Sequence, residues 1–246
     1  MKKLLITLCL LLNALYAEDI YATFDVLSDQ TSDLGVSVSG VVGALYVNVG
    51  TYAKKGDLLL ALQNAEEKQA VESARIAMQS AQKSAEHAQK TYERYAAIAD
   101  VIDKEKMDNY RYEKDVAALS YQNARTTLAM KEAAFAKTEL RAPYDLVITK
   151  KQTELGSIVF GGQTTLLSAM NPHMIKLVLK FDEKYWQKVK IGQKFTYKVD
   201  GSDKTYEGTI AKLYPSVLSA TREMQAEVKA ADLMPGLFGN GMIKAE

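Results

Sequence analysis

Few residues in this 246-residue chain have the types and spacing that chemistry requires. The two histidines, His87 and His173, have no second ligand at the spacing of a zinc site. His173 precedes Met174, and this pair could bind a soft metal, although a loop without ligands is the simpler interpretation. The run that starts at Gly161 lacks the lysine of a phosphate-binding loop, and the chain has no nucleophile elbow. We therefore expect no catalytic residues, no metal site, no cofactor and no enzyme activity.

The N-terminal segment is typical of a secretory signal. Lys2 and Lys3 precede an apolar run over residues 4–12, and Ala17 stands just before two acidic residues. The run is shorter than the roughly 20 residues that span a membrane, which favours cleavage over anchoring. We therefore expect residues 1–17 to be a cleavable signal peptide that directs the chain to the periplasm.

The single cysteine, Cys9, lies inside this segment. It could be a lipidation site, but the preceding Leu8 is bulky where such sites have a small residue, so an apolar signal residue is favoured. Cleavage would leave a chain without thiols, and no disulfide could form.

The charges are nearly balanced, with 31 basic and 30 acidic residues. A nucleic-acid-binding protein would be expected to have a concentrated basic face. The overall balance therefore gives no reason to expect nucleic acid or an anionic membrane as a partner.

Residues 64–140 contain neither glycine nor proline and are rich in alanine, glutamate, lysine and glutamine, a composition that favours helix. The first half has two series spaced by seven, which indicate a coiled-coil seam: Val71, Met78, Ala85, Tyr92 and Ala74, Ala81, Ala88, Tyr95.

The pattern breaks near Asp100, and Asp103 is suited to cap a second helix. The seam of this second helix is interrupted by Lys114 and Lys131, and Pro143 is expected to end it. Two helices of about 35 residues would form a hairpin on the order of 50 Å long. A single straight rod is the alternative, but the flanking segments belong together, which favours the hairpin.

Segments rich in valine, leucine and glycine flank the helical region and indicate short strands joined by turns. A third region after Pro172 contains four strand-like runs, at residues 175–181, 195–199, 206–213 and 224–229, and a short helical patch. This region predicts a six-stranded barrel, whose core we expect Tyr185 and Trp186 to cap. Residues 20–36 show only a weak pattern.

Two segments carry a resemblance to a known family. Residues 38–62 contain a Val-x-x-Gly turn and Lys-Lys-Gly-Asp at 54–57, and resemble the first half of a lipoyl-like domain. Residues 138–167, with Ala142-Pro143, Gly156 and Gly162, resemble the second half, although Leu146 replaces a glycine that is common in the family. A lipoyl-like domain split by a helical hairpin and followed by a barrel resembles the membrane fusion proteins, the periplasmic adaptors of efflux pumps.

The resemblance implies an α+β fold of elongated, multidomain form: a long coiled-coil hairpin inserted in a lipoyl-like β-sandwich, followed by a six-stranded β-barrel. The expected division is a signal peptide (1–17), an N-terminal segment belonging to the barrel or to a minimal membrane-proximal region (18–35), the first half of the lipoyl-like domain (36–63), the hairpin (64–140), its second half (141–171) and the barrel (172–246).

The resemblance also implies sites and partners. Adaptors of this family often place Arg, Leu and Ser around the hairpin turn to dock on a channel, and the matching residues are Arg94, Ile98 and Asp103. Barrel motifs of adaptors for resistance-nodulation-division pumps match residues that would face the pump: Thr221, Arg222, Pro235 and Gly236. The implied partners are an inner-membrane efflux transporter, an outer-membrane channel and further copies of the chain in a ring, with six expected. The pump would hold the chain at the inner membrane.

Three alternatives remain open. The chain could serve an ABC-type exporter or a secretion system, it could be a biotin or lipoate carrier, or it could be a coiled-coil scaffold without a transport role. A carrier would need a lysine at the turn where this chain has Ala61-Leu-Gln-Asn64, and none is present.

Overall fold

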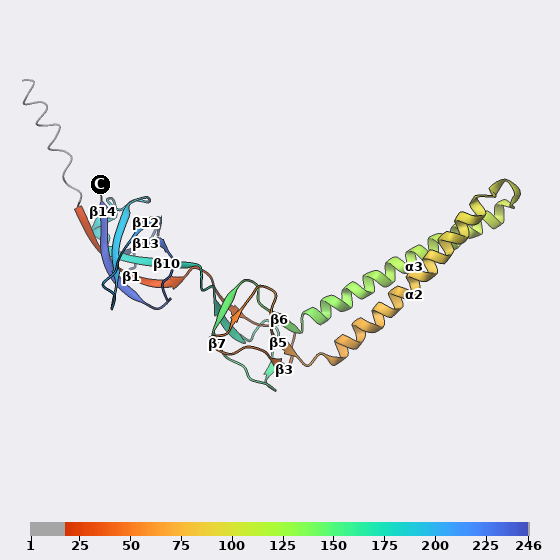
Figure 1. Cartoon of the computed structure of the whole chain (residues 1–246), viewed down its shortest axis with the longest axis horizontal. Coiled ribbons are helices and arrows are strands. Elements are labelled where there is room, and N and C mark those ends of the chain that lie inside the picture. Colours follow the sequence, from red (N-terminus) through yellow and green to blue (C-terminus); the bar gives the residue numbers. More distant parts are fainter. Residues whose placement is uncertain (1–17, 246) are drawn as a thin grey trace, which may run out of the picture. The chain divides into compact units, whose positions relative to one another are not determined.

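The structure is a computed structural model that describes residues 18–245. Two compact units can be distinguished: residues 33–144 and 148–168 form one, and the rest of the described chain forms the other. The first contains a helical hairpin and most of a β-sandwich, and the second contains a β-barrel (Figure 1). The predicted signal peptide and Cys9 lie outside the described residues.

The β-sandwich is built from strands on both sides of the hairpin. One sheet has the order β6-β5-β3-β8, formed by β3 (Gly40–Leu45) and β5 (Leu58–Leu62) before the helices and β6 (Glu139–Arg141) and β8 (Ile158–Val159) after them. Within it, Val41 pairs with Ile158 and Leu60 pairs with Leu140. The prediction that the two flanking segments close into one domain is therefore confirmed.

The second sheet of the sandwich has the order β2-β9-β7-β4. Its strands are β2 (Thr31–Leu34), β9 (Leu167–Met170), β7 (Leu146–Lys151) and β4 (Tyr52–Ala53). The core consists of aliphatic side chains with almost no exposed surface, among them Leu59, Leu60, Ile148, Val159 and Leu166.

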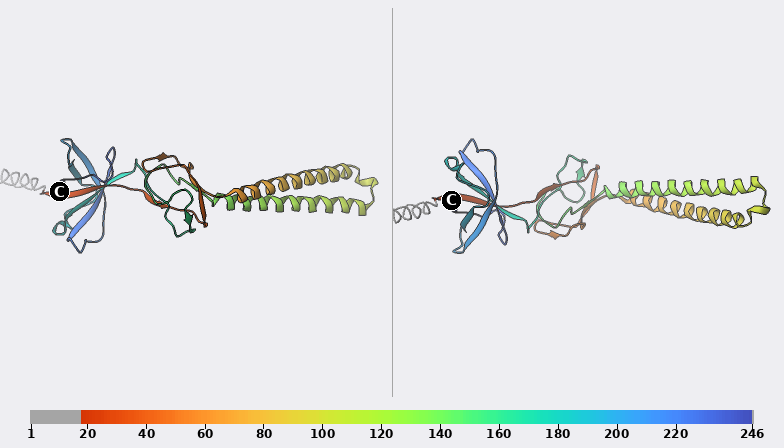
Figure 2. Two further views of the ribbon diagram at one scale, coloured as in Figure 1. Left: turned by 90° about the horizontal axis from the view of Figure 1, so that it is seen from below. Right: turned by 90° about the horizontal axis from the view of Figure 1, so that it is seen from above.

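The helical excursion is a hairpin of α2 (Ala65–Ala96) and α3 (Lys104–Ala136), which lie side by side in both views of Figure 2. The predicted seam of α2 is confirmed, because all eight of its residues are at least partly buried and Ala74 is fully buried. At the base, the Asn64 side-chain amide donates to Thr138 Oγ1 at 3.0 Å and joins the two ends of the hairpin.

The second helix ends earlier than predicted. It stops at Ala136, and the chain enters β6 at Glu139, before it reaches Pro143. The end is made by local bonds instead: Lys137 N–H reaches the carbonyl of Ala133, and Thr138 donates from both its N–H and its hydroxyl to the carbonyl of Phe135.

The barrel closes in the order β1-β10-β13-β12-β11-β14, which confirms the predicted six strands. The strands are β1 (Glu18–Ser28), β10 (Ile175–Asp182), β11 (Lys194–Val199), β12 (Thr205–Leu213), β13 (Glu223–Ala230) and β14 (Phe238–Ala245). The four strand-like runs correspond to β10 to β13, and the two terminal strands complete the wall. On β1 the core side chains alternate along the strand: Ile20, Ala22, Phe24 and Val26.

Aromatic rings fill the centre of the barrel. Phe24 lies edge-on to Phe195 and Tyr197, with ring centroids 5.9 and 5.2 Å apart. Gly241 on β14 makes room for this packing, because a Cβ there would lie 2.7 Å from Cζ of the Phe195 ring.

The expectation for Trp186 is wrong. Tyr185 packs against the barrel core as predicted, but 61% of Trp186 is exposed. Val189 fills the core beside Tyr185 and leaves the indole outside.

The register of the strands defines the two rims of the barrel. Asp182 pairs with Glu223, so residues 183–193 and 214–222 lie together where β1 begins; this end is called the first rim. Residues 200–204 and 231–237 lie at the opposite end, where β1 ends, which is called the second rim.

Candidate functional site

The hairpin tip is built from the end of α2, a short 3-10 turn η2 (Ala99–Val101) and the start of α3. Local bonds shape the turn: Ile98 N–H donates to the Tyr95 carbonyl and Val101 N–H to the Ile98 carbonyl. Asp103 caps α3, as predicted, by accepting a bond from the Glu105 N–H at 2.8 Å. The tip is therefore a closed turn whose side chains remain outside.

All three predicted tip residues lie on this turn. Arg94 is exposed in the last turn of α2, where the negative end of the helix dipole favours a cation. Ile98 is 49% exposed. Val101, which the sequence analysis did not select, is 82% exposed and adds a second aliphatic side chain. The signal that could have identified Val101 is its position in the sequence, two residues before the helix-capping Asp103 and outside the heptad seam.

A layer of aromatic side chains lies directly behind the tip. The rings of Tyr95 and Tyr110 stack with centroids 4.3 Å apart and planes 1° from parallel. Lys114, one of the two lysines that interrupt the predicted seam, lies 4.7 Å from the centroid of the Tyr92 ring. A hydrogen bond between the two stacked tyrosines raises the pKa of Tyr110. This layer links the two helices where alanine side chains are too short to interlock deeply.

Replacing Tyr95 by alanine is expected to loosen the tip, because it removes the stack on Tyr110 that joins the helices. The loss should be about 1 kcal/mol of local stability, visible as faster amide hydrogen exchange over residues 96–104. Tyr95→Phe keeps the ring and should exchange nearly as wild type does. Tyr112→Ala, which removes a mostly exposed ring on the same hairpin, should not change the tip. Equal exchange in the Tyr95→Ala and Tyr112→Ala variants would contradict this role.

The four barrel residues predicted to face the pump do not lie together. Thr221 and Arg222 belong to the first rim, and Pro235 and Gly236 belong to the second. Gly236 has a φ of 96° and donates its N–H to the Val26 carbonyl at 2.8 Å, so this pair forms a turn against the end of β1. A single flat contact on one rim could include only one of the two pairs.

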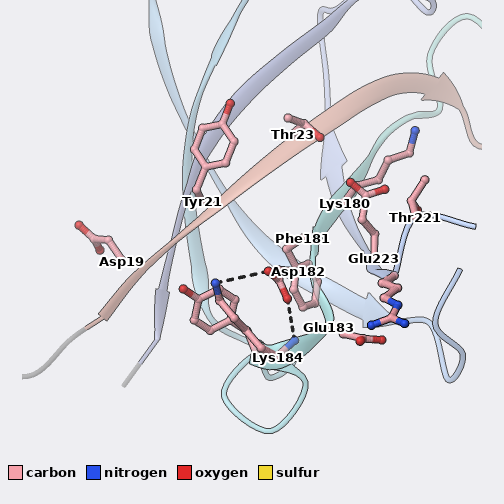
Figure 3. A pocket seen from close by; sticks show the side chains of 12 residues that line it. Asp19, Tyr21, Thr23, Lys180, Phe181, Asp182, Glu183, Lys184, Thr221 and Glu223 are labelled. Atoms are coloured by element: carbon pink, nitrogen blue, oxygen red, sulfur yellow. Dashed lines mark hydrogen bonds and ion pairs between the residues drawn. The ribbon is translucent and has the colours of Figure 1, made fainter. Parts of the chain in front are cut away.

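Thr221 and Arg222 line a pocket of about 650 Å³ together with residues of β1, β10 and the turn after it (Figure 3). Asp182 lies in this pocket, where it accepts from the Lys184 N–H at 2.9 Å and pairs with its ammonium at 3.3 Å. The backbone hydrogen bond is the main reason why the pKa of Asp182 is lowered. The pocket is open and is lined by side chains of both charges.

A buried carboxylate in the barrel wall was missed by the sequence analysis. Glu227 on β13 accepts from Lys176 Nζ at 2.8 Å and from Tyr214 Oη at 2.7 Å, and pairs with Lys212 at 3.2 Å. Burial opposes the ionisation of Glu227, but these hydrogen bonds outweigh it and lower its pKa to about 2. Such a network depends on pairing across strands, which a single sequence does not reveal.

Within residues 18–245, no cluster of three potential ligands is placed to hold a metal ion. His87 and His173 are both exposed. No helix in the same range has the length and apolar character needed to cross a membrane.

The fold matches solved structures over nearly the whole chain. The membrane fusion protein Spr0693 from Streptococcus pneumoniae superposes with a TM-score of 0.68 at 13% identity, covering 92% of this chain and 99% of that one. A MacA–MexA chimera that carries the α-hairpin of Pseudomonas aeruginosa MexA has a TM-score of 0.70 at 23% identity, covering 94% of this chain and 83% of the chimera. The chain thus has the fold of the membrane fusion proteins, as its sequence predicted.

Sequence similarity points to a particular relative. The cobalt-zinc-cadmium resistance protein CzcB from Cupriavidus metallidurans is 27% identical over 222 residues, which cover 85% of this chain and 42% of CzcB. The chain therefore spans less than half the length of this relative. No family model matches the sequence.

Proposed function

We propose that this chain is the periplasmic adaptor of a tripartite efflux system, joining an inner-membrane transporter to an outer-membrane channel. The observation that carries the proposal is the hairpin: two long helices leave and re-enter one sandwich and present exposed Ile98 and Val101 at their turn. A stiff arm with an apolar tip suits contact with a partner at a distance, and it has no evident use in a catalyst.

In this proposal the role of the chain is mechanical and not enzymatic. Arg94, Ile98 and Asp103 form the surface that meets the channel, with Val101 added to it. An arginine beside aliphatic side chains can bond to helix-end carbonyls of a partner while the apolar groups are buried. Copies of the chain would pack side by side into a ring, with six as the expected number.

Thr221 and Arg222, which line the pocket on the first rim, are assigned to the transporter. Pro235 and Gly236 close a turn on the second rim, and a role for them in pump binding would require a separate contact. Residues 1–17 would direct the chain to the periplasm and be cleaved off, and the pump would hold the chain at the inner membrane.

The cargo would be a toxic compound such as a drug or a metal ion. The name of CzcB, a cobalt-zinc-cadmium resistance protein, favours metal ions as the cargo. The described residues offer no metal cluster, so cargo selection would belong to the transporter. An adaptor for an ABC-type exporter would have the same architecture and is the second candidate.

A deletion strain tests the proposal. Loss of the gene is expected to lower the tolerated concentration of at least one exported drug or metal several-fold, and a plasmid copy should restore it. Unchanged tolerance to every drug and metal in a broad panel would reject the adaptor role. The intact mass of the native protein distinguishes the adaptor from a biotin or lipoate carrier. A biotin or lipoate adduct on a lysine would support the carrier alternative, and an unmodified mass would contradict it.

A further inference from the structure

The β10–β11 connection on the first rim is a rigid turn. It begins with η3 (Glu183–Tyr185), and the Gln193 side chain closes its far end by accepting from the Lys190 N–H and donating to the Lys188 carbonyl. Gly192 N–H donates to the Ile210 carbonyl and ties the turn to β12. The buried Val189 anchors its centre in the barrel core. The backbone that carries the exposed side chains of this turn is therefore held in place.

Apart from Gln187, the exposed side chains of this turn are apolar or cationic. Trp186 and Ile191 are 61% and 65% exposed, although both are large and apolar. From residue 184 to residue 194 the chain contains four lysines and no acidic residue. The near-neutral charge of the whole chain hides this local concentration. We call residues 184–194 the basic turn.

The neighbouring turn on the same rim adds to this surface. Val217 and Leu218 are more than a third exposed, and Arg222 follows them. The left-handed backbone of Arg222 (φ 56°) is held by a bond from its N–H to the Leu218 carbonyl. The first rim therefore presents apolar side chains from two turns together with cationic ones.

We propose that the basic turn of the first rim rests directly on a bilayer, with Trp186 and Ile191 among the headgroups and the lysines on anionic lipid phosphates. Tryptophan prefers the membrane–water interface, and each lysine near an anionic surface strengthens binding. The contact is additional to the proposed binding of the transporter and does not depend on it.

The composition favours lipid over an acidic protein surface. Protein interfaces are enriched in arginine and depleted in lysine, whereas all four cations of the basic turn are lysines. The acidic side chains nearby line the pocket beside the turn, as Asp182, Glu183 and Glu223 do in Figure 3. Asp182 is paired with Lys184 there, so the outer part of the turn remains positive.

The test uses the intrinsic fluorescence of Trp186, the single tryptophan of the chain. With vesicles of phosphatidylcholine and phosphatidylglycerol, its emission is expected to move to shorter wavelength and to be quenched by brominated lipids. Vesicles of phosphatidylcholine alone should give little change, and high salt should reverse the shift. Because the signal arises at residue 186, binding through the N-terminal segment alone would not produce it.

Charge-reversal variants supply the control. In the Lys188→Glu, Lys190→Glu double variant, the lipid concentration that gives half of the full shift should rise at least about twentyfold. The loss of each lysine accounts for roughly fivefold. Lys190→Glu with Lys194→Glu, which keeps Lys188 beside Tyr185, should behave alike. Lys54→Glu with Lys55→Glu makes the same change of net charge in the sandwich and should leave the shift intact.

Three results would overturn the proposal. These are emission that stays unchanged with anionic vesicles at low salt, an equal shift with neutral vesicles, and a shift that persists in both rim variants. A shift produced only by the purified transporter in neutral detergent would assign the rim to a protein partner instead.

Discussion

Replacing Arg94 by aspartate is expected to abolish efflux-dependent resistance while the protein still folds. The tolerated concentration of the exported compound should fall at least tenfold. Arg94 is exposed at the end of α2, so its loss from the free chain costs only the helix-dipole term, about 0.5 kcal/mol. In the assembled system the same change would place a carboxylate against partner carbonyls, and a repulsive contact of this kind costs several kcal/mol.

The measurement combines growth on the exported compound with thermal unfolding of the purified variant. The melting temperature should stay within about 2 °C of wild type. Arg125→Asp is the matched control, because Arg125 is an exposed arginine of α3 outside the tip, and it should leave resistance unchanged. Full resistance in the Arg94→Asp strain would show that this residue does not take part in docking.

Replacing Glu227 by glutamine is expected to destabilise the barrel more than any surface substitution. The side chain is only 10% exposed and is bonded to Lys176, Lys212 and Tyr214. Lowering its pKa from 4.5 to about 2 corresponds to about 3 kcal/mol of stability at neutral pH. Denaturant unfolding should show a loss of this order, whereas Asp25→Asn, at a half-exposed pair with Lys180 on the same barrel, should cost less than about 1 kcal/mol.

The pH dependence has a definite sign. The folded pKa of Glu227 is below its ordinary value, so its contribution is complete above pH 4.5 and is lost as the pH falls towards 2. Wild type should therefore lose stability more steeply than Glu227→Gln in this window, and the two curves should converge in acid. Parallel curves between pH 4.5 and 2 would contradict the network.

The arrangement of the sandwich could be predicted because short sequence motifs identify each of its halves. Glycine turns and valine runs on either side of the alanine-rich segment each described half a domain, and a half-sandwich requires its partner. The seam of α2 was equally accessible, since a repeat of seven fixes one face of a helix. The role of Lys114 could not be predicted, because its cation–π contact with Tyr92 depends on the register between the two helices.

The barrel shows why the rest could not be predicted. Residues 20–36 showed only a weak pattern in the sequence, because β1 joins the sheet by pairing with β10 and β14, both distant in sequence. The predicted strand over residues 224–229 already separates Thr221–Arg222 from Pro235–Gly236, and β13 places the two pairs beyond its opposite ends. The sequence alone could therefore have separated the two pairs, although all four residues were assigned to one contact. Trp186 was expected to cap the core together with Tyr185, whereas Val189 packs beside Tyr185 and the indole remains exposed.

Site-specific photocross-linking in cells tests most directly whether the hairpin tip meets an outer-membrane channel. A benzophenone amino acid at position 98 is expected to capture the channel protein, identified by mass spectrometry of the adduct. The same probe at Ile76, an equally exposed aliphatic residue farther down α2, should not capture it. Capture from position 76 but not from position 98, or from neither, would contradict docking through the tip.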